Sequence, residues 1–397
     1  MQTGRRGATL LSTAIAVLLL AGLVNATAAT RTPPCFGAAS RDPATPCVNN
    51  ALNRVAIPSP YDAPLEPSEP CQRIERIFPP ACAFGTPAAK AETTVALLGD
   101  SHSTHWRAAL AYVARRRRWH GVSMNRNLCP FTLARTKRHD RCKGWTRGAL
   151  RWLRNHPEVR TLFVSANAGS GMQAVRGQTQ RETKILGYQQ AWSAIPRSVR
   201  EVYVLRDVPH SRGDTADCVA GAVARHRNPA VRCARPRDAA LLPDPEAEAA
   251  ELDPADRVEV VDLTAFMCDE QSCPPVVGGA LVIKDIGHMT RTFSRTLGPF
   301  LGQAVDLLRG APAALPAARR PPGSKPGGCL MRACVRSGRR RRRPRSSRRP
   351  GQPRPRRSCH PRRCRRPCPR CLRQEDLRTR RCRSRCPRPS VRRHRRT

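Results

Sequence analysis

Five short apolar runs alternate with amphipathic stretches between residues 93 and 309, and this alternation limits the folds that the chain can adopt. Strands that alternate with helices favour a mainly parallel sheet with helices on both of its faces. The sequence therefore predicts an α/β domain of ordinary size, with three layers around a five-stranded sheet. We expect strands at 94–98, 121–125, 161–166, 201–208 and 258–264, and helices at 103–118, 143–156, 182–195 and 290–308.

Two segments of different composition flank this predicted domain. Residues 31–92 are rich in proline and have no long periodic pattern, so we expect an irregular lead-in. Residues 311–397 contain 32 Lys and Arg residues against two acidic residues, and they supply most of the chain's formal charge of +43. A segment of this kind buries too little apolar surface to offset its ordering entropy, so we predict a disordered tail.

Three interpretations of the basic tail remain open. Arginine runs such as residues 338–350 are typical of segments that bind nucleic acid or another anionic surface. Cys368 and Cys371 have the spacing of a metal-binding pair, but no second pair with histidines follows, so the metal signal is weak. A mixture of Arg, Pro and Cys is also what a GC-rich gene gives when it is read out of frame. We favour this last interpretation, which tail peptides in the native protein would contradict.

The N-terminus has the pattern of an export signal. Arg5 and Arg6 precede the apolar residues 8–24, and the small residues 26–28 match a cleavage site. Because about 17 apolar residues is the lower limit for spanning a bilayer, residues 1–30 are either a signal peptide or a single membrane anchor. In both cases the body of the protein is extracytoplasmic, which argues against nucleic acid as its partner.

Ten of the 18 cysteines precede the tail, and they agree with an oxidising compartment. In chain order they form five closely spaced pairs, which favours disulfides between sequence neighbours, although spacing alone does not fix the connectivity. No pair has the two-residue spacing of metal ligands, so metal binding is the weaker alternative. These cysteines are Cys35, Cys47, Cys71, Cys82, Cys129, Cys142, Cys218, Cys233, Cys268 and Cys273.

Ser101 follows the first predicted strand, at the edge of the sheet where open α/β folds place their chemistry. A helix that begins there offers N–H groups to a developing oxyanion. A serine nucleophile also needs a base, and Asp285 and His288 precede the last predicted helix at a spacing that lets a carboxylate orient an imidazole. Each half alone is a weak signal, because a serine in a turn is more often polar filler or a helix cap.

His102, His105 and Asn167 are polar residues near the ends of predicted strands, and each has an ordinary structural explanation. We expect His102 to pack or hydrogen-bond locally and His105 to lie on the surface of its helix. No acidic residue or cysteine stands near them at ligand spacing, so we predict no metal site there. Asn167 follows the third predicted strand, where it is either a turn residue or an amide donor to an oxyanion; the backbone N–H of Ser101 is the safer donor.

The stretches 99–102 (GDSH) and 285–288 (DIGH) together resemble the SGNH, or GDSL-like, hydrolase superfamily. The resemblance is closer to the extracytoplasmic SGNH domain of bacterial membrane O-acyltransferases of the acyltransferase family three type, and it covers residues 35–308. It implies a flavodoxin-like three-layer domain over residues 93–310 without a cofactor. It also implies Ser101 as the nucleophile, His288 as the base and Asp285 as the residue that holds His288. Further matching segments are 35–39, 129–131, 162–166, 206–220 and 260–301.

The chain departs from the superfamily pattern at its oxyanion motifs. The usual glycine block is replaced by NRNLCPF at residues 125–131, and no GxND motif stands in the middle of the chain. This departure leaves the oxyanion donors open between the Ser101 backbone and Asn167.

The resemblance implies an exported serine-dependent O-acyltransferase or esterase that acts, through an acyl-enzyme, on acyl groups of a cell-surface or cell-wall glycan, with acetyl the favoured group. Its partner would be an acylated surface polysaccharide or peptidoglycan. Since the chain has no bundle of membrane helices to deliver an acyl donor, transfer requires a separate membrane acyltransferase, or the chain is the severed part of a fused one. Acting alone, it is expected to hydrolyse. The alternative is a catalytically inactive glycan-binding or scaffolding module that works with a membrane acyltransferase.

Overall fold

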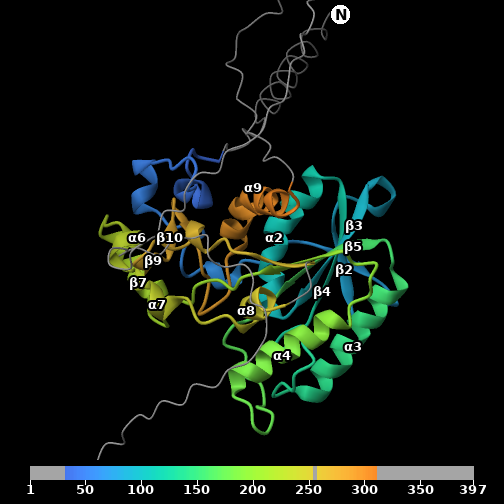
Figure 1. Cartoon of the computed structure of the whole chain (residues 1–397). Helices are drawn as coiled ribbons and strands as arrows, with labels where there is room; N and C mark the ends of the chain where they lie inside the picture. The colour runs from blue at the N-terminus through green and yellow to red at the C-terminus, as the bar shows by residue number, and fades with distance from the viewer. Residues whose placement is uncertain (1–31, 254–256, 311–397) are drawn as a thin grey trace, which may run out of the picture. The chain divides into compact units, whose positions relative to one another are not determined.

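A seven-stranded sheet runs through the computed structural model, which describes residues 32–253 and 257–310 (Figure 1). The strand order is β1-β2-β4-β3-β5-β6-β8, and the five strands from β4 to β8 are parallel. These five are the strands that the apolar runs predict, so the mainly parallel α/β sheet is confirmed. The strands are β1 (Gln72–Ile74), β2 (Ala81–Gly85), β3 (Thr93–Gly99), β4 (Trp119–Asn125), β5 (Val159–Ser165), β6 (Glu201–Leu205) and β8 (Val258–Val261).

The sheet is larger than predicted because the proline-rich lead-in contributes β1 and β2. Strand β2 pairs antiparallel with β4, with Phe84 opposite Gly121, and β1 pairs antiparallel with β2. Both strands are so short, and so closely flanked by prolines, that the alternation of apolar and polar residues typical of a strand is not visible in the sequence. The lead-in is therefore part of the sheet, and its description as irregular is wrong at residues 72–74 and 81–85.

Helices cover both faces of the sheet, which confirms the three layers (Figure 1). Helices α2 and α9 lie on one face and α3 and α4 on the other. The α-helices are α2 (Ser101–Arg116), α3 (His139–Asn155), α4 (Gln180–Ser193), α5 (Thr215–Ala224), α6 (Pro229–Arg232), α7 (Arg237–Ala240), α8 (Pro245–Glu251) and α9 (Arg291–Leu308). Short elements complete the domain: 3-10 helices at Gly37–Arg41, Asn50–Arg54, Ala63–Leu65, Ala88–Lys90 and Thr264–Phe266, and strands β7 (Arg235–Pro236), β9 (Ser272–Cys273), β10 (Val276–Val277) and β11 (Ala280–Leu281).

The two cores take alternate residues of the central strands. In β3, Val95 and Leu97 join the cluster under α2 and α9, whereas Ala96 and Leu98 join the cluster under α3 and α4. All four side chains are fully buried, which is why this strand reads as a continuous apolar run. Burial of a leucine on this scale stabilises the fold by about 1.5–3 kcal/mol.

Five disulfides join the ten body cysteines between sequence neighbours, as the spacing favours. The pairs are Cys35–Cys47, Cys71–Cys82, Cys129–Cys142, Cys218–Cys233 and Cys268–Cys273. Cys71 precedes β1 and Cys82 lies in β2, so one of these bonds ties the two added strands together.

The predicted signal peptide or anchor in residues 1–30 lies outside the described residues, and so does the basic tail, 311–397, with Cys368 and Cys371. Within the described part of the chain, no helix combines the length and the apolar character needed to cross a bilayer.

Candidate active site

The turn between β3 and α2 carries Ser101 at the carboxyl edge of the sheet. Gly99 has φ +144, a conformation that side chains rarely adopt, and a Cβ atom there would overlap the carbonyl oxygen of Ser165 in β5. Asp100 then caps the helix, because its carboxylate accepts the N–H of His102 at 2.8 Å. Helix α2 therefore begins at Ser101, two residues earlier than predicted, and the serine is not its cap.

Ser101, Asp285 and His288 line one pocket of about 270 Å³. The histidine and the aspartate lie on the loop before α9, and His288 Nδ1 is 2.8 Å from Asp285 Oδ2. The other oxygen of Asp285 accepts the backbone N–H groups of Gly287 and His288, at 2.9 and 2.8 Å. Burial alone would raise the pKa of Asp285, but these hydrogen bonds and His288 hold it well below its usual range. The carboxylate is thus charged and oriented toward the imidazole.

The lead-in forms a further wall of this pocket through Pro64, Pro67, Ser68 and Glu69. Glu66 accepts the backbone N–H groups of Arg291 and Thr292, at 2.6 and 3.1 Å, where α9 begins. The ammonium group of Lys284 donates to the backbone oxygen of Glu66 at 3.2 Å. The lead-in is therefore fixed to the segment that carries His288, and the pocket includes residues more than two hundred positions apart.

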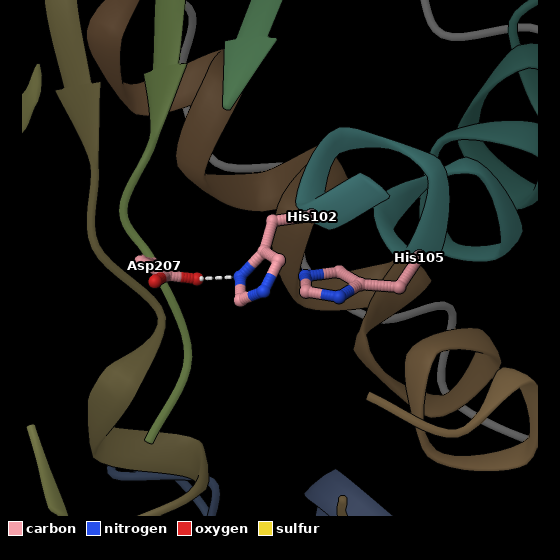
Figure 2. Close-up of side chains that lie close together, drawn as sticks. All are labelled: His102, His105 and Asp207. Atoms are coloured by element: carbon pink, nitrogen blue, oxygen red, sulfur yellow. Dashed lines mark hydrogen bonds and ion pairs between the residues drawn. The ribbon is translucent and has the colours of Figure 1, made fainter. Parts of the chain in front are cut away.

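His102 follows Ser101 in the chain, is fully buried and does not line this pocket. The sequence predicts only local contacts for it, and this prediction is wrong: Nδ1 is 2.6 Å from a carboxylate oxygen of Asp207, a residue that follows β6 (Figure 2). Its other ring nitrogen is 2.9 Å from Nδ2 of Asn167. Burial alone would lower the pKa of His102, but the charge and hydrogen bond of Asp207 raise it. No spacing in the sequence links His102 with Asp207, because only the order of the parallel strands brings them together.

His105 is also buried, with 8 % of its surface exposed, so its predicted position on the helix surface is wrong. Its side chain faces α9 and the loop before it, and its Nδ1 accepts the backbone N–H of Met289 at 3.3 Å. Burial holds the pKa of His105 well below its usual range. This imidazole is neutral at neutral pH.

The donor atoms of His102, His105 and Asp207 lie within 4.8 Å of one another, a distance at which three such groups can hold a metal ion (Figure 2). The hydrogen bonds argue against that use. One oxygen of Asp207 accepts from His102 and from the backbone N–H of Val208, at 2.6 and 2.8 Å. The other oxygen accepts the N–H of Ala168 at 2.8 Å. A metal ion would have to displace these donors from a buried carboxylate, so the group fits a hydrogen-bonded His–Asp pair better than a metal centre.

Asn167 is brought to the same edge, where it is half-buried. Its backbone N–H donates to Asp100 at 3.0 Å, and its side chain contacts His102, so it is bonded to both sequence neighbours of Ser101. Asn167 is thus anchored to the turn that carries Ser101.

A three-layer α/β domain with Ser101 and the Asp285–His288 pair at the carboxyl edge of its sheet has the features of an SGNH domain. A family model described as "SGNH domain (fused to AT3 domains)" matches residues 68–303, and the chain belongs to this family. The match begins before β1 and so includes both strands that the lead-in adds.

Among solved structures, the chain is similar to the periplasmic domain of a lipopolysaccharide acetyltransferase from Salmonella ser. Paratyphi A. The identity is 13 %, the alignment covers 54 % of this chain and 84 % of that chain, and the TM-score is 0.42. A search of curated proteins found no match.

Proposed function

We propose that the protein is an extracytoplasmic, serine-dependent O-acyltransferase or esterase that acts on acyl groups, acetyl above all, of a cell-surface or cell-wall glycan. The observation that carries the proposal is the hydrogen-bonded Asp285–His288 pair, which lines the same pocket as Ser101 in a chain of the AT3-associated SGNH family. A charged carboxylate, an imidazole and a hydroxyl at one pocket are the groups that acyl transfer through a serine ester requires.

Each of the three side chains has a definite part in the proposed reaction. Asp285 accepts the Nδ1–H of His288, which leaves Nε2 of that ring as a base. Nε2 takes the proton of Ser101 Oγ as the oxygen attacks the carbonyl carbon of the acyl group. The backbone N–H of Ser101 has no partner within α2, because Ser101 is the first residue of the helix, and it can donate to the oxyanion together with the Asn167 amide.

Collapse of the tetrahedral intermediate releases the first alcohol, which takes its proton from His288. A sugar hydroxyl or water then attacks the acyl-enzyme with His288 again as base, which completes transfer or hydrolysis. The association of this family with AT3 domains supports a membrane acyltransferase as the partner that supplies the acyl group. An acylated polysaccharide or peptidoglycan is the proposed glycan.

The test compares cleavage of a short-chain acyl ester by the purified protein and by Ser101→Ala, His288→Ala and Asp285→Asn. Each substitution is expected to lower kcat/KM by about 10²–10⁴-fold. His156→Ala is the matched control, because His156 Nδ1 is likewise 2.8 Å from a carboxylate, that of Glu158, at an exposed site. It should retain full activity.

Covalent labelling of Ser101 by a fluorophosphonate, read by mass spectrometry, tests the nucleophile without knowledge of the natural acyl group. Labelling that His288→Ala abolishes supports the serine mechanism. A folded protein that neither cleaves the ester nor labels at Ser101 would instead be the inactive glycan-binding or scaffolding module.

A further inference from the structure

The orientation of the Asn167 amide follows from one hydrogen bond. The backbone N–H of Gly169 donates to the side-chain oxygen of Asn167 at 2.7 Å. The nitrogen of the amide is therefore the atom that faces His102, where it lies 2.9 Å from Nε2. Because an amide nitrogen donates and does not accept, Nε2 of His102 must be the acceptor.

This polarity fixes the proton on the imidazole as well. With a lone pair on Nε2, the ring proton of His102 is on Nδ1, where it donates to Asp207 at 2.6 Å. Asp207 can only accept, because the backbone N–H groups of Ala168 and Val208 already donate to its two oxygens. Although burial raises the pKa of Asp207, the hydrogen bonds and charges around it hold that pKa well below its usual range. Donors and acceptors match at each step from Gly169 through Asn167 and His102 to Asp207.

This hydrogen-bonded series lies against His288 and against the loop that carries it. The ring centroids of His102 and His288 are 4.9 Å apart. Gly287, in the loop that holds His288, lies so close that a Cβ atom there would be 3.2 Å from Cε1 of His102. Within the described part of the chain, Asn167 Nδ2 has no hydrogen-bond partner other than His102, so its second N–H is free for a group in the site.

We propose that His102 is a positioning residue: as the Nδ1–H tautomer held by Asp207, it fixes the amide of Asn167 so that the second N–H faces the acyl oxyanion. This inference rests on the proposed function. It gives the buried His102–Asp207 pair a role distinct from that of the Asp285–His288 pair, because Nε2 of His102 is already occupied and cannot take a proton from Ser101.

A double-mutant cycle tests whether His102 acts through Asn167. We expect Asn167→Ala to lower kcat by about 10²–10³-fold, the usual loss of one oxyanion donor, with KM little changed. His102→Leu should lower kcat by at least tenfold, and His102→Gln, whose side-chain oxygen can accept the Asn167 N–H, should recover part of it. In the Asn167→Ala background, His102→Leu should have no further effect. A loss that is equally large in both backgrounds would overturn the proposal, as would full activity of His102→Leu.

Nitrogen NMR of the unsubstituted protein tests the polarity without any variant that could fail to fold. Because Asp207 raises the pKa of His102, the spectrum is recorded at a pH well above that pKa, where we expect one ring proton, on Nδ1, and none on Nε2. A proton on Nε2 would overturn the proposal. Failure of the proposed function gives a different result, namely Ser101→Ala with the activity and labelling of the parent, whatever the tautomer of His102. His156→Leu is the control for a histidine outside the site.

Discussion

Replacement of Gly99 by alanine tests whether the turn before Ser101 is fixed by close backbone packing. The new Cβ would overlap the carbonyl oxygen of Ser165 and lie 2.8 Å from the Cβ of Ser103. Neither neighbour can move freely, because Gly99 and Ser165 are paired in the β3–β5 ladder and Ser103 Oγ donates to the backbone oxygen of Asp100 at 2.7 Å. The strain must therefore be stored or relieved by a shift of the turn.

The expected size follows from two contributions. A φ of +144 is open mainly to glycine, and holding an alanine there costs about 1–3 kcal/mol. Overpacking at a site that cannot relax costs about another 1–3 kcal/mol. For a domain of this size, about 2–6 kcal/mol lowers the melting temperature by about 5–20 °C. If a shift of Asp100 and Ser101 relieves the strain instead, labelling of Ser101 should slow by about 10²-fold, because a displacement of about 1 Å has that effect on a catalytic group.

The assay combines thermal unfolding with the rate of fluorophosphonate labelling. Gly144→Ala is the matched control: Gly144 lies within α3 and a Cβ there meets no atom within 4 Å, so alanine should stabilise the protein by about 0.5–1 kcal/mol. Gly99→Ala should thus lower the free energy of unfolding, whereas Gly144→Ala should raise it. A Gly99→Ala variant with both the melting temperature and the labelling rate of the parent would refute the reasoning.

Two further predictions concern stability. Burial and the charge of Asp207 raise the pKa of Asp244 from 3.8 to about 6. The proton on Asp244 therefore stabilises the folded state fully below about pH 4, and this stabilisation, about 3 kcal/mol, is lost as the pH rises through 6. Asp244→Asn should remove this part of the pH dependence. In urea unfolding, the free energy of unfolding of the variant should therefore rise relative to that of the parent between pH 4 and pH 7, and an equal change in both proteins would contradict the assignment. Replacing Cys71 and Cys82 together by alanine opens a loop of sequence separation 11 and should cost about 3 kcal/mol, measured by urea unfolding. An unchanged free energy of unfolding would mean that β1 and β2 stay paired without the disulfide.

The parallel part of the sheet could be predicted because each of its strands is buried on both faces and forms an apolar run. The strands β1 and β2 could not, since they are three and five residues long and stand among prolines. Their place in the sheet depends on pairing with β4, which is a tertiary contact and leaves no local pattern.

The candidate site likewise contains residues that local spacing can predict and residues that only the tertiary fold brings together. Ser101 stands at a strand end and Asp285 stands three residues before His288, so local spacing suffices to nominate them. The role of Asp207 as a partner of His102 depends on β6 lying two strands away from β3 in the sheet, which no spacing records. The burial of His105 likewise depends on the loop before α9 folding over α2.

The antiparallel pairing of β2 with β4 also determines how this chain ends its sheet. The outermost strand, β1, is three residues long, exposes Gln72 and Arg73, and so offers little backbone to another molecule. A chain cut at residue 93, where the alternating pattern begins, would instead present the whole edge of β4, seven residues with five of them buried in the intact fold. The short lead-in strands therefore cover an edge that would otherwise be open to pairing with another chain, and this cover comes from the segment with the least regular sequence.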